Sequence, residues 1–259
     1  MSTVILNIED HLGVITLNRP EAFNSVDADL ARELIAALDA CDQNPKIRAI
    51  LLTGSGKAFC AGQDLKEITD DSSNPGFERL LEDRYKPIVT RLRTMELPIV
   101  AAVNGVAAGA GANFALACDI VVATESASFI QAFSAIGLIP DSAGTFTLPR
   151  AVGFGKATAL AMLGDKVSAA EAERMGMIYK VFPAVEFESA AREIAVRLST
   201  MPTKGLALTK KAFNASMHNT FEAQLELENE LQIAAANTAD FNEGVSAFVE
   251  KRKPTFTGN

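Results

Sequence analysis

Residues Ile99–Gly111 read IVAAVNGVAAGAG, an uninterrupted apolar run that ends in a glycine-rich turn. Residues 49–54 (AILLTG) repeat this arrangement, and residues 120–123 (IVVA) form a third apolar run. Short continuous apolar runs separated by helical segments are typical of strands that are covered on both faces of a mostly parallel sheet. The sequence therefore predicts an α/β fold.

The segments on either side of these runs complete the expected architecture. Val4–Ile8 and Val14–Leu17 flank a short polar turn and are predicted to form a hairpin, and Asp27–Leu38 has apolar side chains at helical spacing. Further helices are expected over 157–163, 169–175, 188–198, 204–216, 221–236 and 240–252, the last opening on a capping box of Asp240 and Glu243. This order predicts an α/β core over 1–200 and a helical C-terminal region over 201–259.

Composition bounds the partners and the compartment. The 259 residues carry a net charge of −8, and 48% of them are hydrophobic, enough to bury a substantial core. The acidic balance argues against a nucleic-acid partner, and no stretch of about 18 uncharged apolar residues predicts a membrane span. Cys41, Cys60 and Cys118 form neither a disulfide framework nor a metal-binding motif, and no signal peptide is evident. We therefore expect a cytoplasmic protein without a metal.

Two glycine-rich turns, residues 54–62 and 105–111, are the first candidates for a functional site. Glycine permits close backbone approaches, and a helix that begins near Gly109 would direct free N–H groups and its positive end at a developing negative charge. Asp64 with Glu67 is predicted to cap the helix after the first turn. The alternative is an ordinary strand-to-helix connection.

Other familiar sites fit the sequence poorly. The turn at Gly109 lacks the third small residue of a G-x-G-x-x-G motif, and no acid lies about 20 residues later, which argues against a nicotinamide cofactor. There is no G-x-S-x-G motif, and the only histidines, His11 and His218, are interpreted as surface residues. Cys60 is interpreted as a buried small residue, with a nucleophile as the lesser alternative.

Asp141, in the turn Gly137–Gly144 (GLIPDSAG), is the candidate catalytic acid or base. Flanking residues are expected to provide apolar walls around it: Phe129, Phe133, Ile136, Leu138 and Ile139. Desolvation by such walls raises the pKa of a carboxyl group and makes it a better base. An Asp after Pro is also common as a turn or cap residue, so the residue type alone leaves both roles open.

Several of these segments together resemble the enoyl-CoA hydratase/isomerase (crotonase) superfamily, over nearly the whole chain. The resemblance rests on Phe59–Leu65 (FCAGQDL), Pro98–Gly111, Ile139–Asp141, Asn18–Ser25 (NRPEAFNS) and Glu243–Arg252 (EGVSAFVEKR). It implies a spiral core of ββα units, a helical C-terminal trimerisation region, and homotrimers or hexamers built as dimers of trimers. It also implies an acyl-CoA substrate, with no cofactor besides the coenzyme A thioester itself.

The resemblance assigns roles to particular residues. The backbone N–H groups of Gln63 and Ala110 fall at the oxyanion hole, where each donor to the thioester oxygen contributes about 3 kcal/mol to transition-state binding. The implied residues for CoA and substrate binding are Phe23, Ala61, Asp64, Leu65 and Phe133, with Phe248 and Lys251 reaching the CoA of a neighbouring subunit. Lys251 at a helix C-terminus equally fits compensation of the helix dipole.

Departures from the family pattern decide the expected reaction. The two glutamates of the hydratases fall here on Asn113 and Phe133, neither of which transfers a proton at neutral pH. Asp141 falls where several isomerases and a dehalogenase of the superfamily carry their acid. A finer resemblance, which includes Ala132–Ser134 and the ending Phe256–Gly258, is to isomerases of ring-1,2-epoxyphenylacetyl-CoA in phenylacetate catabolism. We therefore expect an isomerase that shifts a 3-enoyl double bond to the 2-position, converts such an epoxide to an oxepin, or does both.

Three alternatives stay open on the sequence. The first is an enoyl-CoA hydratase with a rearranged acid/base set. The second is a non-catalytic family member that binds CoA or RNA. The third is a thioester hydrolase or dehalogenase in which Asp141 acts as a nucleophile.

Overall fold

The computed structural model describes residues 2–70, 72 and 74–259, and two sheets form its centre. The larger sheet has the order β1-β2-β3-β5-β7-β10, and the smaller has the order β4-β6-β8-β9. The strands are β1 (Val4–Glu9), β2 (Leu12–Leu17), β3 (Ala49–Gly54), β4 (Ala58–Cys60), β5 (Ile99–Val103), β6 (Val106–Ala108), β7 (Ile120–Thr124), β8 (Ser128–Ile130), β9 (Lys166–Ser168) and β10 (Lys180–Phe182).

Helices connect and cover these strands. They are η1 (Pro20–Ala22), α1 (Ala28–Gln43), α2 (Leu65–Thr69), α3 (Phe77–Leu80), the π-helical turn η2 (Leu81–Tyr85), α4 (Lys86–Thr94), α5 (Ala110–Ala117), η3 (Ser134–Ile136), α6 (Gly144–Val152), α7 (Phe154–Leu163), α8 (Ala169–Arg174), α9 (Ala184–Ser199), α10 (Thr203–Ser216), α11 (Phe221–Ala236) and α12 (Ala239–Glu250).

The chain alternates between the two sheets as it proceeds. β3, β5 and β7 pair in parallel in the larger sheet, while β4, β6 and β8 pair in parallel in the smaller one. Each ββα unit therefore adds one strand to each sheet before its helix, and the units stack as a spiral. β1 and β2 pair antiparallel, which confirms the predicted hairpin. The mostly parallel sheet is also confirmed, because the other described strands of the larger sheet pair in parallel.

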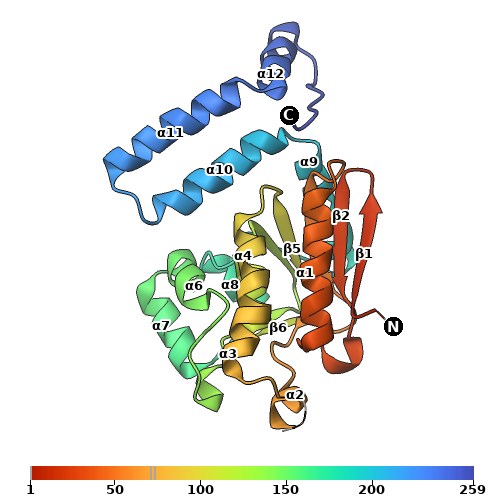
Figure 1. The fold of residues 1–259 in the computed structure, drawn as a ribbon, viewed down its shortest axis with the longest axis vertical. Helices are drawn as coiled ribbons and strands as arrows, with labels where there is room; N and C mark the ends of the chain where they lie inside the picture. The colour runs from red at the N-terminus through yellow and green to blue at the C-terminus, as the bar shows by residue number, and fades with distance from the viewer. Residues whose placement is uncertain (1, 71, 73) are drawn as a thin grey trace.

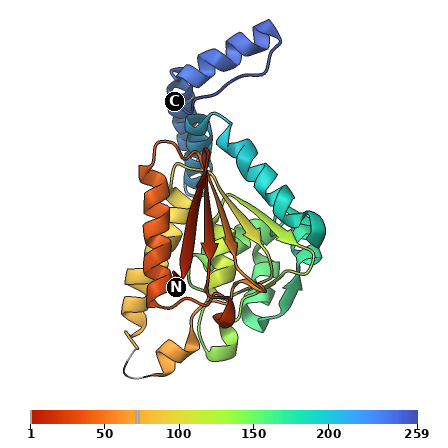
Figure 2. The same ribbon diagram turned by 90° about the vertical axis from the view of Figure 1, so that its right-hand side faces the viewer.

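Both faces of the larger sheet are buried, as the continuous apolar runs predict. In the register of the sheet, Ile15 pairs with Leu52 and Leu52 with Ala101, and this row faces α1. The alternate row, which includes Leu51 and Val100, faces α9. Figure 2 shows the sheet between these two helices. Two apolar layers thus fix the larger sheet, and the glycine-rich turns begin at the ends of its strands β3 and β5.

The C-terminal helices extend away from the sheets. α10 and α11 lie alongside each other beyond the core, and α12 and the C-terminus lie near the N-terminal end of α10 (Figure 1). Lys210 on α10 ties this region to the core, since its Nζ lies 2.9 Å from the carboxylate of Asp119 and 3.1 Å from the carbonyl oxygen of Leu92. Large apolar side chains stay exposed on α11 and α12, among them Phe221, Ile233, Phe248 and Val249.

The predicted capping box at Asp240 is wrong. Thr238 caps α12, because its hydroxyl accepts the N–H of Phe241. Asp240 is instead buried, and its carboxylate accepts the N–H groups of Thr257 and Gly258 at 2.6 and 2.8 Å. A tertiary contact with the C-terminal tail has replaced the local one, and Asp240 holds the tail against α12.

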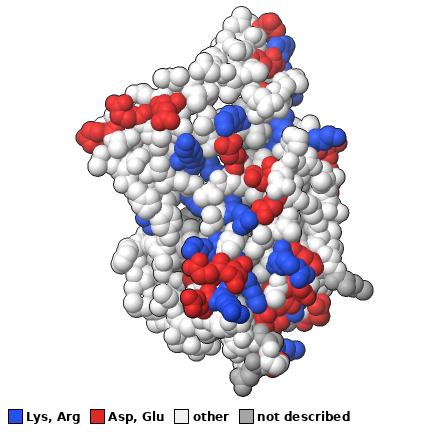
Figure 3. All heavy atoms as spheres, viewed as in Figure 1, with Lys and Arg blue, Asp and Glu red and all other residues white. Residues whose placement is uncertain are grey.

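Charges on the face drawn in Figure 3 are interspersed, apart from an acidic group over α11. The glutamates of α11 are Glu222, Glu226, Glu228 and Glu230, and this helix has no Lys or Arg. This face therefore offers no broad basic surface. In the described part of the chain, no helix combines the length and apolarity needed to cross a bilayer, and no three His, Cys, Asp or Glu side chains are placed to hold a metal ion.

Candidate active site

The two glycine turns meet at the carboxyl ends of β4 and β6. Gly62 has a φ of 87°, and a Cβ at this position would lie 2.9 Å from the carbonyl oxygen of Ala108. A Cβ on Gly111 would lie 2.2 Å from the carbonyl oxygen of Cys60. Only glycine permits these approaches, because a side chain would force the turns apart. The N atom of Ala110 is 3.5 Å from the same Cβ position of Gly62, so the main chains at 63 and 110 are neighbours.

Two N–H groups at this junction have no hydrogen-bond partner among the described residues. A short bridge fixes the peptide at Gln63: the N–H of Val26 donates to Gly62, and the N–H of Asp64 donates to Val26. The intervening N–H of Gln63 therefore faces away from Val26. Neither this N–H nor that of Ala110 donates to another residue in the described ranges. Ala110 is also the first residue of α5, where the helix dipole adds positive potential.

These N–H groups face a cavity of about 300 Å3. Most of its walls are apolar, including Leu65, Ile68, Leu80, Leu81, Phe133 and Leu138. Gln63, Ala110 and Asp141 line the same cavity, and Asp141 is the one carboxylate among its described lining residues. The structure thus brings the three predicted catalytic positions together, although 78 residues separate the first from the last in the chain. A cavity of this kind suits a ligand that is mostly apolar with one polar group.

Asp141 lies between η3 and α6, where the backbone is strained. Ser142 and Ala143 have φ angles of 50° and 62°, in the left-handed region that residues other than glycine rarely adopt. Such strain is concentrated at functional sites. The hydroxyl of Ser142 donates to Oδ1 of Asp141 at 2.9 Å. Burial raises the pKa of Asp141 above its ordinary value, and the bond from Ser142 opposes this shift only in part.

The amide of Asn113 contacts the backbone of Asp141. The side chain of Asn113 is fully buried, and its Nδ2 donates to the carbonyl oxygen of Asp141 at 2.8 Å. Oδ1 of Asn113 in turn accepts from Nε2 of Gln131 at 2.9 Å. A Cβ on Gly144 would lie 2.3 Å from Nδ2 of Asn113, so α6 begins directly against this amide. The amide at 113 therefore holds the backbone of Asp141.

The sequence profile of the enoyl-CoA hydratase/isomerase family matches residues 7–259. The chain belongs to the enoyl-CoA hydratase/isomerase family. It is similar to a protein named probable enoyl-CoA hydratase from Rhodobacter capsulatus, with 48% identity over 256 residues that cover 99% of this chain and 98% of the relative. It is also similar to the 1,2-epoxyphenylacetyl-CoA isomerase of Escherichia coli, with 44% identity over 260 residues that cover 100% and 99% of the two chains.

Solved structures of the enoyl-CoA hydratase/isomerase family share the fold. The structure of an enoyl-CoA hydratase from Bacillus anthracis matches with a TM-score of 0.91 and 33% identity, covering 99% of this chain and 100% of that one. The expected crotonase spiral is thereby confirmed, and the chain is an enzyme of this hydratase/isomerase family. An acyl-CoA substrate is consistent with the family.

Two of the five residues predicted to line the cavity around Asp141 do not line it. Phe133, Ile136 and Leu138 line the cavity as expected. Phe129 instead belongs to the hydrophobic core, because β8 directs it between the sheets and the helices. Ile139 is 78% exposed, because the turn before Asp141 directs it to the surface. Ala132 and Phe133 occupy the wall where the resemblance places the second glutamate of the hydratases.

The residues predicted to bind CoA differ in whether they line the cavity. Ala61 and Leu65 line the cavity, whereas Asp64 does not. The N–H groups of Ala61 and Asp64 already donate to Phe23 and Val26, so they are not available to a ligand. Phe23 is 52% exposed beside this segment. A contact from Ala61 or Asp64 to CoA thus depends on their carbonyl oxygens, whereas Leu65 can use its side chain.

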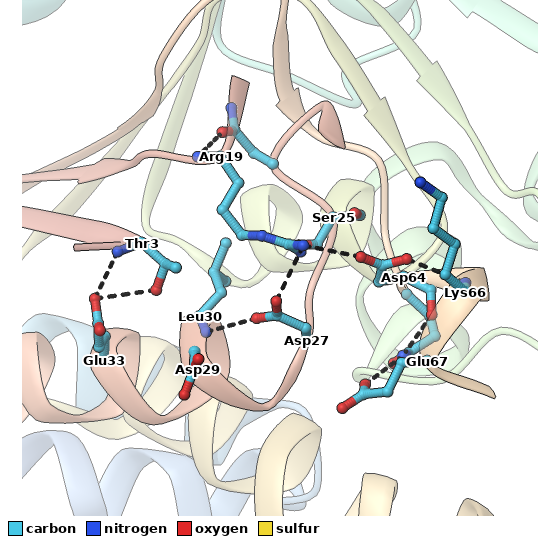
Figure 4. Close-up of polar contacts among 12 residues, drawn as sticks. Thr3, Arg19, Ser25, Asp27, Asp29, Leu30, Glu33, Asp64, Lys66 and Glu67 are labelled. Carbon is cyan, nitrogen blue, oxygen red and sulfur yellow. Dashed lines mark hydrogen bonds and ion pairs between the residues drawn. The ribbon is translucent and has the colours of Figure 1, made fainter. Parts of the chain in front are cut away.

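The acidic side chain of Asp64 has a structural role. As predicted, it caps α2, accepting the N–H of Lys66, but Glu67 does not complete a capping box, because the N–H of Asp64 donates to Val26. It also pairs with Arg19, whose Nη2 lies 3.0 Å from the carboxylates of both Asp64 and Asp27, as Figure 4 shows. Asp27 caps α1 through the N–H of Leu30. Arg19 therefore joins the first turn of two helices and fixes the segment that carries Gln63.

Phe248 and Lys251 lie on or at the end of α12, and neither lines this cavity in the same chain. Phe248 is 85% exposed, and the predicted contact with the CoA of a neighbouring subunit stays a prediction. In the adjacent basic segment, Arg252 pairs with Glu243 and Glu250, which leaves Lys251 and Lys253 without an ion pair in the described part of the chain.

The alternative nucleophiles and bases lie elsewhere. Burial raises the pKa of the Cys60 thiol to about 12, so it is not ionised at neutral pH. His11 and His218 are exposed, as expected from the sequence. Tyr85, in contrast, lines the cavity and was not predicted. Its apolar neighbours Phe77, Leu80 and Leu81 line the same wall, and their helical spacing is the signal that could have identified this segment.

Proposed function

We propose that this family member is an acyl-CoA isomerase that shifts a double bond from the 3-position to the 2-position. The observation that carries the proposal is the pairing of one desolvated carboxylate with two unpartnered N–H groups in an apolar cavity. The two-glutamate mechanism of hydration lacks its acids here, because Asn113 and Phe133 occupy the positions where the resemblance implies the glutamates. Isomerisation needs only one acid.

The residues divide the reaction between them. The N–H groups of Gln63 and Ala110 bind the thioester oxygen, which acidifies the protons on C2 of a 3-enoyl group. The carboxylate of Asp141 removes one of these protons, and the C2–H electron pair becomes part of a dienolate whose negative charge rests on the bound oxygen. The protonated Asp141 then returns the same proton to C4. The double bond now joins C2 and C3, and the enzyme is back in its starting state.

The apolar walls favour this reaction over water addition. Phe133 and Ala132 line the cavity, so that water near C3 has no carboxylate or hydroxyl to orient it on that side. The raised pKa of Asp141 brings it closer to that of a general base at neutral pH. The carboxylate therefore exchanges its proton with the substrate in a dry environment.

The same site suits an aromatic substrate that carries a ring epoxide. The similarity to a 1,2-epoxyphenylacetyl-CoA isomerase supports this second candidate substrate. Polarisation of the thioester by Gln63 and Ala110, with proton transfer by Asp141, would assist opening of the epoxide to a seven-membered oxepin. Both reactions use one acid and release no fragment.

A hydratase with a rearranged acid/base set is the rival, which the name of the Rhodobacter capsulatus relative supports. Incubation with a 3-enoyl-CoA and with crotonyl-CoA, followed by chromatography of the products, separates the two. The proposal predicts 2-enoyl-CoA from the first and at most a trace of 3-hydroxyacyl-CoA from the second. Rapid hydration of crotonyl-CoA without isomerisation of the 3-enoyl substrate would refute it.

We further propose that residues 201–259 assemble the enzyme as a trimer or as a hexamer of two trimers in the cytoplasm. The exposed apolar side chains of α11 and α12, including Phe221, Ile233 and Phe248, support an interface in this region. In such an assembly Phe248 and Lys251 would approach the CoA of a neighbouring subunit. Light scattering coupled to size exclusion tests this, and a monomer at micromolar concentration would contradict it.

A further inference from the structure

One hydroxyl group in the cavity has no role in the proposed reaction. Tyr85 is 4% exposed and lines the cavity, and its hydroxyl donates to Oε1 of Gln63 at 2.5 Å. Burial raises the pKa of this phenol above its ordinary value, so that it stays a protonated donor across the pH range of an assay. The contact is made to the side chain of the residue whose main-chain N–H is proposed to bind the thioester oxygen.

The side chain of Gln63 is held at all of its polar atoms. Its Nε2 donates to Oε2 of Glu67 and to the carbonyl oxygen of Asp64, both at 3.1 Å, while Oε1 accepts from Tyr85. Glu67 is itself held by Arg84, with 2.6 Å between Nη1 and Oε2. The side chain therefore anchors this residue from the cavity side, and the bridge to Val26 anchors its main chain from the other side.

Tyr85 also contacts α5, the helix that begins at the second donor of the proposed oxyanion hole. Its ring centroid lies 5.9 Å from that of Phe114, with the rings tilted by 40°. Phe114 is buried on α5, the helix that begins at Ala110. One side chain thus touches the Gln63 turn through its hydroxyl and the Ala110 helix through its ring. A residue in this place can set the spacing between the two N–H groups.

The backbone around Tyr85 is unusual in a way that fits such a role. Residues Leu81–Tyr85 form a π-helical turn between α3 and α4. Such turns are rare, occur mostly as single turns within helices, and are frequent at functional sites. This turn ends on Tyr85 and includes Arg84, so its two last residues both contact the segment 63–67. A regular α-helix would rotate these side chains relative to each other.

We propose that Tyr85 is a positioning residue that holds the N–H of Gln63 in register with that of Ala110, so that both donate to one thioester oxygen. The inference rests on the proposed function of these N–H groups. Removal of the hydroxyl alone, as in Tyr85→Phe, keeps the ring and its packing on Phe114. The expected result is a fall in kcat of about tenfold, with KM within about twofold, because small misplacements of preorganised groups impair the transition state more than binding.

A spectroscopic measurement reports the oxyanion hole independently of turnover. Cinnamoyl-CoA absorbs at longer wavelength when its carbonyl is polarised, so the red shift on binding measures how well the two N–H groups hold the oxygen. We expect a red shift in the parent enzyme, less than half of it in Tyr85→Phe, and the full shift in Tyr179→Phe. Tyr179 is the only other tyrosine and is exposed, which makes it the matched control.

The outcomes separate this inference from the proposed function. A full red shift and unchanged kcat in Tyr85→Phe, or a rise in KM alone, overturns the role of Tyr85 and leaves the isomerase proposal standing. No red shift in the parent enzyme overturns both. A red shift that Tyr85→Phe diminishes, in an enzyme that does not isomerise 3-enoyl-CoA, refutes the proposed reaction and supports the role of Tyr85.

A second variant covers the case in which Tyr85→Phe does not fold. Gln63→Met removes the acceptor of the Tyr85 hydroxyl but keeps the length of the side chain and the main-chain N–H. It is expected to reproduce the loss of red shift, and a full shift in this variant overturns the inference. Where both variants fold, the double variant should lose no more than Gln63→Met alone, because that change already removes the acceptor of the Tyr85 hydroxyl. Losses that multiply also overturn the inference.

Discussion

Replacement of Asn113 by leucine tests whether the buried amide of Asn113 supports Asp141. Leucine keeps the shape of asparagine but removes the donor to Asp141 and the acceptor for Gln131. Gln131 is 4% exposed, and its Oε1 already lacks a partner among the described residues, so its whole amide would be buried unpaired. That costs about 1–3 kcal/mol, and the lost bond to Asp141 adds about 1 kcal/mol. We expect Asn113→Leu to lower the free energy of unfolding by about 2–4 kcal/mol.

A double-mutant cycle with Gln131→Met makes this test specific. Gln131→Met alone leaves Oδ1 of Asn113 unpaired, at a cost of about 1–3 kcal/mol. The double variant replaces both partners by apolar groups of similar shape. Its loss in free energy of unfolding should therefore be smaller than the sum of the two single losses by about 1–3 kcal/mol. The kcat of the double variant, like that of Asn113→Leu, should be about tenfold below that of the parent enzyme, because the carbonyl of Asp141 lacks the amide that holds it.

Urea denaturation measures the stabilities, and isomerisation of a 3-enoyl-CoA measures kcat. Additive destabilisation would show that the two amides do not depend on each other. Parental kcat in Asn113→Leu would refute the role of Asn113 in holding Asp141, since its carbonyl would then be held well enough by the N–H of Gly144, 2.8 Å away.

Three further predictions concern the charge of Asp141 and the packing of the glycine turns. The ratio kcat/KM should fall as pH decreases, with a midpoint above 3.8, the ordinary aspartate value, because the base must be ionised; a midpoint at or below 3.8 in the pH-rate profile would contradict the desolvation. Asp141→Asn should raise the free energy of unfolding at pH 7, because the folded state has the higher pKa and loses stability as pH rises through the window between the two pKa values; in urea titrations this gain should vanish below pH 3.8, and a destabilised variant at pH 7 would refute it. Gly111→Ala should cost about 3 kcal/mol and most of the activity, because its Cβ would lie 2.2 Å from the carbonyl oxygen of Cys60, whereas Gly155→Ala, with open space around its Cβ on α7, should be neutral or stabilising by about 0.5 kcal/mol in thermal unfolding. Equal effects of the two glycine changes would contradict the close approach of the turns.

The long strands and amphipathic helices were predictable from local pattern. The apolar runs at 49–54, 99–103 and 120–123 are the central strands β3, β5 and β7. The second sheet was not predicted, because β4, β6, β8 and β9 have only three residues each and two of them lie within the glycine-rich turns. Three residues carry no periodicity, so these strands depend on their partners in the other units of the spiral.

Two helices near the site also escaped prediction. α6 begins at Gly144 and contains Pro149, residues that in a sequence indicate a loop. The segment 77–94 changes from α to π and back to α, so the helical spacing of Phe77, Leu80 and Leu81 does not continue in one register along it. Both are held by tertiary contacts, as at Gly144 against Asn113, and local propensity does not report such contacts.

In the candidate site, too, local features were predictable and tertiary contacts were not. Asp141 and the two N–H groups of Gln63 and Ala110 were located from glycine turns and from resemblance. The contacts that hold them were not, because Asn113 lies 28 residues from Asp141 and Tyr85 lies 22 residues from Gln63 in the chain. Both pairs meet only because the spiral brings successive units into contact, and no local pattern encodes that meeting.

The rate of Asp141→Asn on a 3-enoyl-CoA tests most directly whether one carboxylate moves the proton. Asparagine keeps the acceptor for the Ser142 hydroxyl and the shape of the cavity but cannot accept a proton from carbon. The account predicts a kcat lower by about 10²–10⁴-fold, a KM close to that of the parent, and a cinnamoyl-CoA red shift that is retained. A folded Asp141→Asn variant that isomerises the substrate at the parental rate would contradict the account.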